Sequence, residues 1–325
     1  MKNKIVNHFI GILGIVLSIA VVWFIIDKYD IKQSLNIIKK TPISSFVIMI
    51  IIYLSTFYFR ALRWKFMLAD IDVFKLRFLL KSIILGFAGN NLIPARGGEL
   101  LRMEFFSRKT KISRTTSLTS IVLEKILDAL ILLAFLICAG FMLDEINDIL
   151  LNTIKIASFI FLPITILLIS IRIKGDKIIR WIGQRSSKVF LLLTNLISKF
   201  YAALTFMKTD INTLKILGLS VLIWSLEGLV FVIGIKAIGI NDSTILVGII
   251  ALCFVNFGIL IPSSPGYIGI FQAALIISLS LFSISSEESL AAAIIIHSCQ
   301  FFPITILGLI IIFTNYFKPF NKKLA

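Results

Sequence analysis

Long apolar runs alternate along this chain with short segments that carry most of the charged residues. A run of about 20 apolar residues crosses the roughly 30 Å of membrane hydrocarbon as one helix. The pattern therefore predicts full spans at about residues 8–26, 42–58, 115–141, 150–171, 213–235 and 290–317. Between the first two spans, Ile31, Leu35 and Ile38 recur at helical spacing, which predicts a short interfacial helix within 27–41.

Two further apolar segments, 74–107 and 244–283, are interrupted by Gly, Pro and polar residues. A single limb such as 78–88 extends only about 17 Å at the helical rise and cannot span the membrane. Interrupted backbone persists at membrane depth only when it is buried in protein or lines a wet cavity. The two segments share the motif Leu-Ile-Pro-x-x-x-Gly, at 92–98 and 260–266. Paired broken segments of this kind point to a transport site between two halves of a chain.

The loop charges predict how the spans are oriented. Basic residues gather at 108–114 and 172–210, and acidic residues at 142–149 and 284–289. Because basic loops stay in the cytoplasm, both termini and both basic segments are expected there, with the acidic loops outside. We expect 172–210 to form one or two amphipathic helices on the cytoplasmic surface. The lysines of 27–41 conflict with this rule, since they fall on the predicted outer side.

With this orientation the two broken segments enter from opposite faces. We therefore predict an all-α polytopic membrane protein, a single membrane domain over 1–325 with an inverted-topology repeat and two opposed re-entrant helical hairpins. The first repeat covers about 42–141 with its hairpin at 74–107. The second covers about 213–317 with its hairpin at 244–283.

Composition supports a membrane protein and removes other classes. Hydrophobic residues make up 58% of the chain and the mean hydropathy is +1.00, above the apolar share of about 45–50% in soluble domains. The formal charge of +16 would suggest nucleic-acid binding in a soluble protein, but here the basic residues cluster between apolar runs, so no nucleic-acid partner is expected. Three cysteines lie inside apolar runs without paired spacing, and we interpret them as small core residues rather than disulfide or metal ligands: Cys138, Cys253 and Cys299.

Charged residues at the first hairpin tip are the leading candidates for substrate binding. A charge at the bilayer centre costs about 2.5–3.5 kcal/mol on insertion scales, so charges kept there usually face a cavity or a partner. One interpretation is that Arg96 binds an anionic head group, helped by free N–H groups where a helix opens at Gly97-Gly98. The alternative is a structural ion pair between Arg96 and Glu99.

Three acids lie in predicted spans. Glu124 and Asp128 are four residues apart and share a helix face. They require cations, for which Arg96, Arg102 and Lys125 are the candidates. The acids either serve the substrate path or brace the fold. Glu227 is the comparable acid of the second half, with the same two interpretations.

The remaining candidates are uncharged. The run 262–266 offers hydroxyl and backbone groups as the opposite cavity wall, although Pro and Gly would also be needed there merely to turn the chain. His297 and Gln300 share a face of the last span, which favours helix-to-helix hydrogen bonds over a proton relay. The full set of expected substrate-binding residues is Asn90, Asn91, Arg96, Gly98, Glu99, Arg102, Glu124, Asp128, Glu227, Pro262, Ser263, Ser264, Gly266 and Gln272.

Three motifs of this chain resemble those of a flippase-like membrane family that includes the N-terminal transmembrane region of lysyl-phosphatidylglycerol synthases. The motifs are Leu92-Ile-Pro-Ala-Arg-Gly-Gly-Glu99, Glu124-Lys-Ile-Leu-Asp128 and Pro262-Ser-Ser-Pro-Gly-Tyr-Ile-Gly269. The resemblance covers about residues 8–316. Where the family usually has Arg and Glu, this chain has Lys125 and Gln272, and Gln272 cannot carry a proton.

The resemblance implies a lipid translocator, moving an anionic or modified phospholipid or a polyprenyl-phosphate-linked glycolipid. Membrane lipid is then the expected partner, together with a lipid-modifying enzyme or glycosyltransferase. The alternatives are a membrane enzyme or accessory subunit of a lipid-linked glycosyltransferase, and a small-solute or ion-coupled transporter. No phosphate-binding loop, H-E-x-x-H helix or G-x-S-x-G elbow occurs. We therefore expect no cofactor, metal or catalytic residue, and we assign no oligomeric state.

Overall fold

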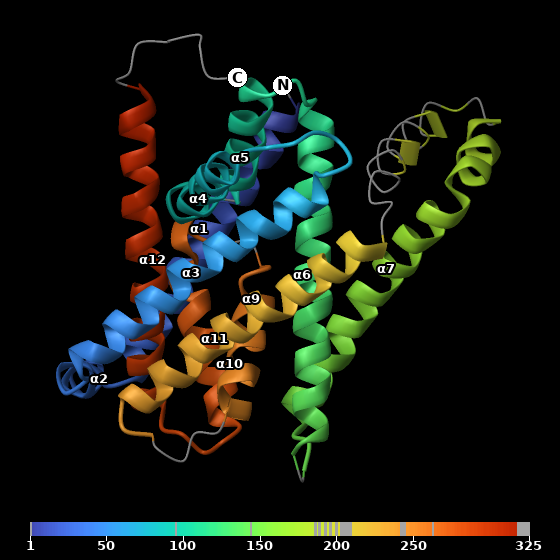
Figure 1. Ribbon diagram of the computed structural model, residues 1–325. Helices are drawn as coiled ribbons and strands as arrows, with labels where there is room; N and C mark the ends of the chain where they lie inside the picture. The colour runs from blue at the N-terminus through green and yellow to red at the C-terminus, as the bar shows by residue number, and fades with distance from the viewer. Residues whose placement is uncertain are drawn as a thin grey trace.

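The computed structural model describes residues 2–94, 96–143, 145–184, 210–240, 245–261 and 263–316, with a few positions between 187 and 201. Throughout these residues the regular structure is helical (Figure 1). The elements are α1 (Lys2–Lys28), α2 (Ile31–Lys39), α3 (Ile43–Met67), α4 (Leu76–Leu92), α5 (Gly97–Lys109), α6 (Arg114–Phe141), α7 (Asp148–Gly183), α9 (Asp210–Ala237), α10 (Ile245–Gly258), the 3-10 turn η1 (Pro265–Tyr267), α11 (Ile270–Ser280) and α12 (Ser286–Tyr316).

Each predicted span coincides with a long helix, namely α1, α3, α6, α7, α9 or α12. Within the described residues, four helices are long and apolar enough to cross a membrane: α3, α7, Asn212–Ala237 of α9 and Ser286–Thr314 of α12. The interfacial helix expected within 27–41 is α2, whose Asp30 cap accepts a hydrogen bond from the Gln33 N–H. The predicted boundary at the end of the second span was wrong, because α3 continues to Met67 instead of ending near Tyr58.

Both broken segments are divided into pairs of shorter helices, as their Gly, Pro and polar interruptions indicated. Helix α4 packs against α5, and α10 packs against α11. Figure 1 shows α4 and α5 toward the end of the molecule where α6 begins, and α10 and α11 toward the opposite end, where α12 begins. Helices α3 and α9, which precede the two pairs, pack along one another, and α12 packs against α4 and α11.

The break between α4 and α5 depends on small residues and one unusual backbone angle. Arg96 takes a left-handed conformation (φ 56°) immediately before α5 begins at Gly97. A side chain at Gly98 would overlap the Gly86 carbonyl oxygen and the Asn90 amide, so α4 and α5 approach more closely than any other residue there would allow. The second break is similar in kind, with Gly266 and Gly269 at φ 68° and 91°.

The amphipathic segment expected over 172–210 is only partly described. Helix α7 continues to Gly183 through a non-helical residue, Lys174. The Tyr201 hydroxyl donates a hydrogen bond to Asp176 at 2.9 Å, so the chain after α7 returns to it. Four apolar positions of the segment that supported the prediction lie outside the described residues: Leu193, Leu196, Phe200 and Leu204.

The topology can be tested by labelling from one side of intact cells. Position 111 lies between α5 and α6, and position 287 lies in the first turn of α12. With the three native cysteines replaced, a cysteine at 111 and a cysteine at 287 are expected to react with a membrane-impermeant maleimide from opposite sides, 287 from outside. Reaction of both from the same side would contradict the predicted topology.

Candidate functional site

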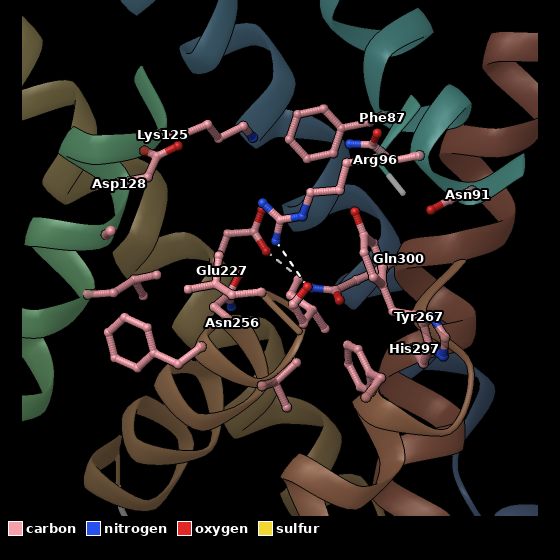
Figure 2. Close-up of a pocket in the computed structure, with 18 of the residues that line it drawn as sticks. Phe87, Asn91, Arg96, Lys125, Asp128, Glu227, Asn256, Tyr267, His297 and Gln300 are labelled. Atoms are coloured by element: carbon pink, nitrogen blue, oxygen red, sulfur yellow. Dashed lines mark hydrogen bonds between the residues drawn. The ribbon is translucent and has the colours of Figure 1, made fainter. Parts of the chain in front are cut away.

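A polar cavity lies among the helices that flank the two breaks (Figure 2). Its empty volume is about 1050 Å³, counting the part that opens to the outside. Apolar and aromatic side chains form much of its wall. Its charged and amide residues are Arg60, Asn90, Asn91, Arg96, Glu99, Lys125, Asp128, Glu227, Asn256 and Gln300.

Glu124 lies behind the cavity wall and is completely buried. Its two carboxylate oxygens accept hydrogen bonds from the Arg102 guanidinium at 3.1 and 2.9 Å. Arg63 Nη2 lies 3.6 Å from the same carboxylate. The Arg102 guanidinium also lies over the Trp64 ring, with its central carbon 3.9 Å from the ring centroid. This paired geometry joins α3, α5 and α6 and fixes their relative orientation.

Asp128 lies one turn further along α6 and reaches the cavity. One oxygen accepts hydrogen bonds from Arg63 Nη1 at 2.6 Å and from Trp224 Nε1 at 3.0 Å. The other oxygen lies 3.7 Å from Arg60 Nη1. Asp128 therefore connects α6 to α3 and α9, and its charge is compensated by two arginines.

Glu227 on α9 also lines the cavity, and both its oxygens have partners. Arg60 Nη2 and the Thr56 hydroxyl donate to one oxygen at 2.9 and 3.4 Å. Gln300 Nε2 donates to the other at 3.1 Å. The expected helix-to-helix hydrogen bond from Gln300 is therefore confirmed.

We call Arg60, Arg63, Arg102, Glu124, Asp128 and Glu227 the buried charge network. Each of these side chains is at most 6% exposed. Of the three cations expected for the α6 acids, only Arg102 pairs with one of them, Glu124. Arg63 and Arg60, rather than Arg96 and Lys125, are the cations next to Asp128. Breaking a buried pair leaves an uncompensated charge, so the network is expected to hold the helices around the cavity.

Arg96 does not pair with Glu99, and the structural-pair alternative was wrong. Arg96 Nη2 donates to the Ile259 carbonyl oxygen at 3.0 Å, across the cavity at the end of α10. Figure 2 shows the Arg96 side chain pointing into the cavity. Glu99 instead lies 3.6 Å from Lys125 Nζ and accepts a long hydrogen bond of 3.5 Å from Asn90.

The second motif faces the cavity through different residues than expected. The Ser264 N–H donates to Ser18 Oγ of α1 at 2.8 Å, and Ser263 packs on Gly14 of the same helix. Neither serine lines the cavity, whereas Leu260 and Tyr267 do. Pro262 lies outside the described residues.

Four of the expected substrate-binding residues contribute instead to contacts between helices near the cavity. Asn91 lines it but directs its amide N–H groups to Thr305 Oγ1 at 2.8 Å and the Phe301 carbonyl oxygen at 3.3 Å. Gln272 accepts from the Gly269 N–H at 2.8 Å and lies 3.1 Å from His297 Nδ1, the other expected contact between helices. Gly98 and Gly266 contribute no side chain to the cavity and instead allow neighbouring helices to pack closely.

A family model described as the lysylphosphatidylglycerol synthase TM region matches residues 11–308. The chain belongs to this family. The resemblance of the three motifs is therefore confirmed. Together with the apolar helices, membership identifies an integral membrane protein.

Three curated proteins are similar to this chain. A UPF0104 membrane protein of Methanothermobacter thermautotrophicus is 25% identical over 327 residues, covering 95% of this chain and 94% of the relative. A second, of Methanocaldococcus jannaschii, is 27% identical over 241 residues, covering 72% and 98%. Glycosyltransferase AglD of Haloferax volcanii is 23% identical over 323 residues, which is 89% of this chain but 51% of AglD. The chain thus spans about half the length of AglD.

Sequence reasoning missed two members of the network in this lysylphosphatidylglycerol synthase TM-type domain. Arg60 and Arg63 fall just beyond the predicted span 42–58, but they are buried in α3, at 2% and 0% exposed. Their spacing of three residues on an otherwise apolar helix was an available signal. Asn256 and Tyr267 were also missed as cavity residues.

Away from the cavity, Glu104 forms ion pairs with two exposed arginines. Glu104 near the end of α5 accepts hydrogen bonds from Arg114 at 2.6 Å and from Arg108 at 2.5 Å. These hydrogen bonds, of which those from Arg114 have the larger effect, lower the pKa of the Glu104 carboxyl to about 2. Within the described part of the chain, no group of three or more His, Cys, Asp or Glu could hold a metal ion.

Proposed function

We propose that this protein moves lipids with a phosphate-containing, anionic head group across the membrane. The head group would enter the polar cavity while the acyl or prenyl chains remain in the hydrocarbon between helices. The chain has no nucleotide-binding motif, so movement would follow the lipid gradient or a coupled ion.

Arg96 is the observation that carries this proposal. Counting the charged residues described in and directly behind the cavity gives five cations (Arg60, Arg63, Arg96, Arg102 and Lys125) and four acids (Glu99, Glu124, Asp128 and Glu227). Every cation except Arg96 lies within 4.0 Å of a carboxylate, whereas Arg96 donates to the neutral carbonyl of Ile259. A single phosphate at Arg96 would therefore neutralise the cluster, and it would gain charge-assisted hydrogen bonds.

The arrangement of the helices supports an inverted repeat with two re-entrant pairs. In that arrangement α4–α5 would enter from the cytoplasm and α10–α11 from outside, both termini would be cytoplasmic, and the domain would lie in the cytoplasmic membrane. Arg96, between α4 and α5, bonds the end of α10, so the contact joins the two breaks. Rearrangement of one pair against the other would then expose the same site to either face.

The likeness to AglD supports a second candidate, a role beside a glycosyltransferase that acts on lipid-linked sugar. In AglD the matching region accounts for about half of the protein. A domain of this family would in that case present or return the lipid carrier. The two proposals share the cavity and differ in whether lipid movement occurs without a partner enzyme.

The test is reconstitution of the purified chain into liposomes that carry fluorescent phosphatidylglycerol labelled on an acyl chain. We expect protein-dependent loss of lipid asymmetry, measured as the fraction of probe accessible to a membrane-impermeant quencher over time. Arg77, an exposed arginine of α4, provides a matched control as Arg77→Lys. Absence of movement above protein-free liposomes, from folded protein, would contradict lipid translocation without a partner.

A further inference from the structure

Lys125 and Glu99 form an ion pair on the cavity wall. Lys125 Nζ lies 3.6 Å from Glu99 Oε1, and their side chains are 32% and 18% exposed. Lys125 also lies over the Phe87 ring, 4.9 Å from its centroid. Both residues line the cavity, in contrast to the fully buried Arg102–Glu124 pair behind it.

Glu99 is the one lining acid described here whose charge depends on a partly exposed cation. Asp128 and Glu227 are held by arginines that are at most 2% exposed. A head group that brought its own ammonium could not displace those arginines, because both are buried and each contacts two carboxylates. Glu99 could receive an ammonium only if Lys125 gave up its place.

The charge balance sets the cost of such a ligand. A phosphate at Arg96 compensates the single excess positive charge. An ammonium on the same head group would restore an uncompensated positive charge within the cavity, which is unfavourable in a site of low dielectric constant. A neutral substituent on the phosphate carries no such penalty.

Acceptor atoms near the charge are placed to bind hydroxyl groups. Asn256 uses its amide N–H on the Leu252 carbonyl oxygen at 2.9 Å, which leaves its own Oδ1 for a ligand. Tyr267 adds a hydroxyl to the same wall. Such groups suit glycerol, inositol or sugar hydroxyls.

We infer that the cavity selects phosphate head groups with a neutral, hydroxyl-bearing substituent against those that carry an ammonium, and that Lys125 sets this selectivity by occupying Glu99. The inference rests on the proposed function. It assigns Lys125 as a specificity-determining residue and predicts that removing its charge opens Glu99 to a substrate ammonium.

The experiment compares two acyl-labelled probes, phosphatidylglycerol and phosphatidylethanolamine, which differ in a glycerol versus an ammonium on the phosphate. The wild type is expected to move phosphatidylglycerol roughly tenfold faster or more, which corresponds to about 1.4 kcal/mol. Lys125→Gln should gain phosphatidylethanolamine movement and reduce the ratio to about threefold or less, about 0.6 kcal/mol. Lys125→Arg should keep the wild-type preference.

Lys111→Gln removes one exposed lysine outside the cavity and is the matched control. It should leave the ratio unchanged. If the wild type moves both probes equally, or if Lys125→Gln keeps the full preference, the inference is overturned while lipid translocation stands. If the wild type moves neither probe, the proposed function fails and the inference with it.

Discussion

Glu124→Gln is expected to destabilise the folded protein by roughly 3–5 kcal/mol, the usual cost of removing one partner from a buried ion pair. The substitution preserves shape but leaves the Arg102 guanidinium without its carboxylate and leaves Arg63 with the carboxylate of Asp128 alone. Because these residues join α3, α5 and α6, lipid movement should fall together with stability. The measurement is thermal unfolding of the purified protein in detergent, alongside translocation by the same preparation.

A double variant tests whether the loss arises from the pair itself. Glu124→Gln with Arg102→Met removes both charges, so it should be less destabilised than the two single losses added together, by about 1 kcal/mol or more. Glu104→Gln is the control, since it removes an acid with two arginine partners at the surface, and a small effect is expected. Additive losses in the double variant, or a fully stable Glu124→Gln protein, would contradict the bracing role.

Gly98→Ala is expected to be the most damaging change of a single methyl group. The added carbon would overlap the Gly86 carbonyl oxygen and the Asn90 amide, both on α4. These are backbone or tightly held atoms that cannot yield cheaply, so α4 and α5 would separate at a cost of roughly 3 kcal/mol or more. We expect low yields of folded protein and loss of lipid movement, measured by size-exclusion profile and reconstitution.

Gly218→Ala in α9 is the corresponding control, because nothing lies within 4 Å of its added carbon. Alanine favours a helix over glycine by up to about 1 kcal/mol, so this variant should be as stable as the wild type or slightly more. Equal tolerance of alanine at 98 and 218 would show that the α4–α5 contact is looser than described.

The helical architecture was largely predictable because each membrane span is a continuous run of apolar residues that can be recognised in the local sequence. The length of α6 and the positions of the two broken segments could be predicted by comparing the length of each apolar run with the thickness of the membrane. The first cation–acid pair was also foreseen in part, since Arg102 was among the candidates for Glu124.

Pairings between distant helices were not predictable. Arg63 meets Asp128 and Arg60 meets Glu227 across 65 and 167 positions, and no local pattern specifies which helix faces which. Both arginines in fact lie beyond the predicted end of the second span, near residue 58, although α3 buries them. Likewise, spacing made Arg96 and Glu99 neighbours along the chain, but the left-handed turn at Arg96 sends the two side chains to different partners.

The binding of the lipid phosphate by Arg96 is tested most directly by measuring phosphatidylglycerol movement in liposomes. The proteins compared are folded Arg96→Lys and Arg96→Ala, with Arg77→Lys as the control. If Arg96 binds the phosphate through its planar fork, Lys keeps the charge but loses the paired hydrogen bonds, so the rate should fall roughly tenfold, and further for Ala. Glu99 keeps Lys125 as its partner in both variants, so thermal stability should change little. Wild-type rates from both Arg96 variants would contradict a head-group site at this residue.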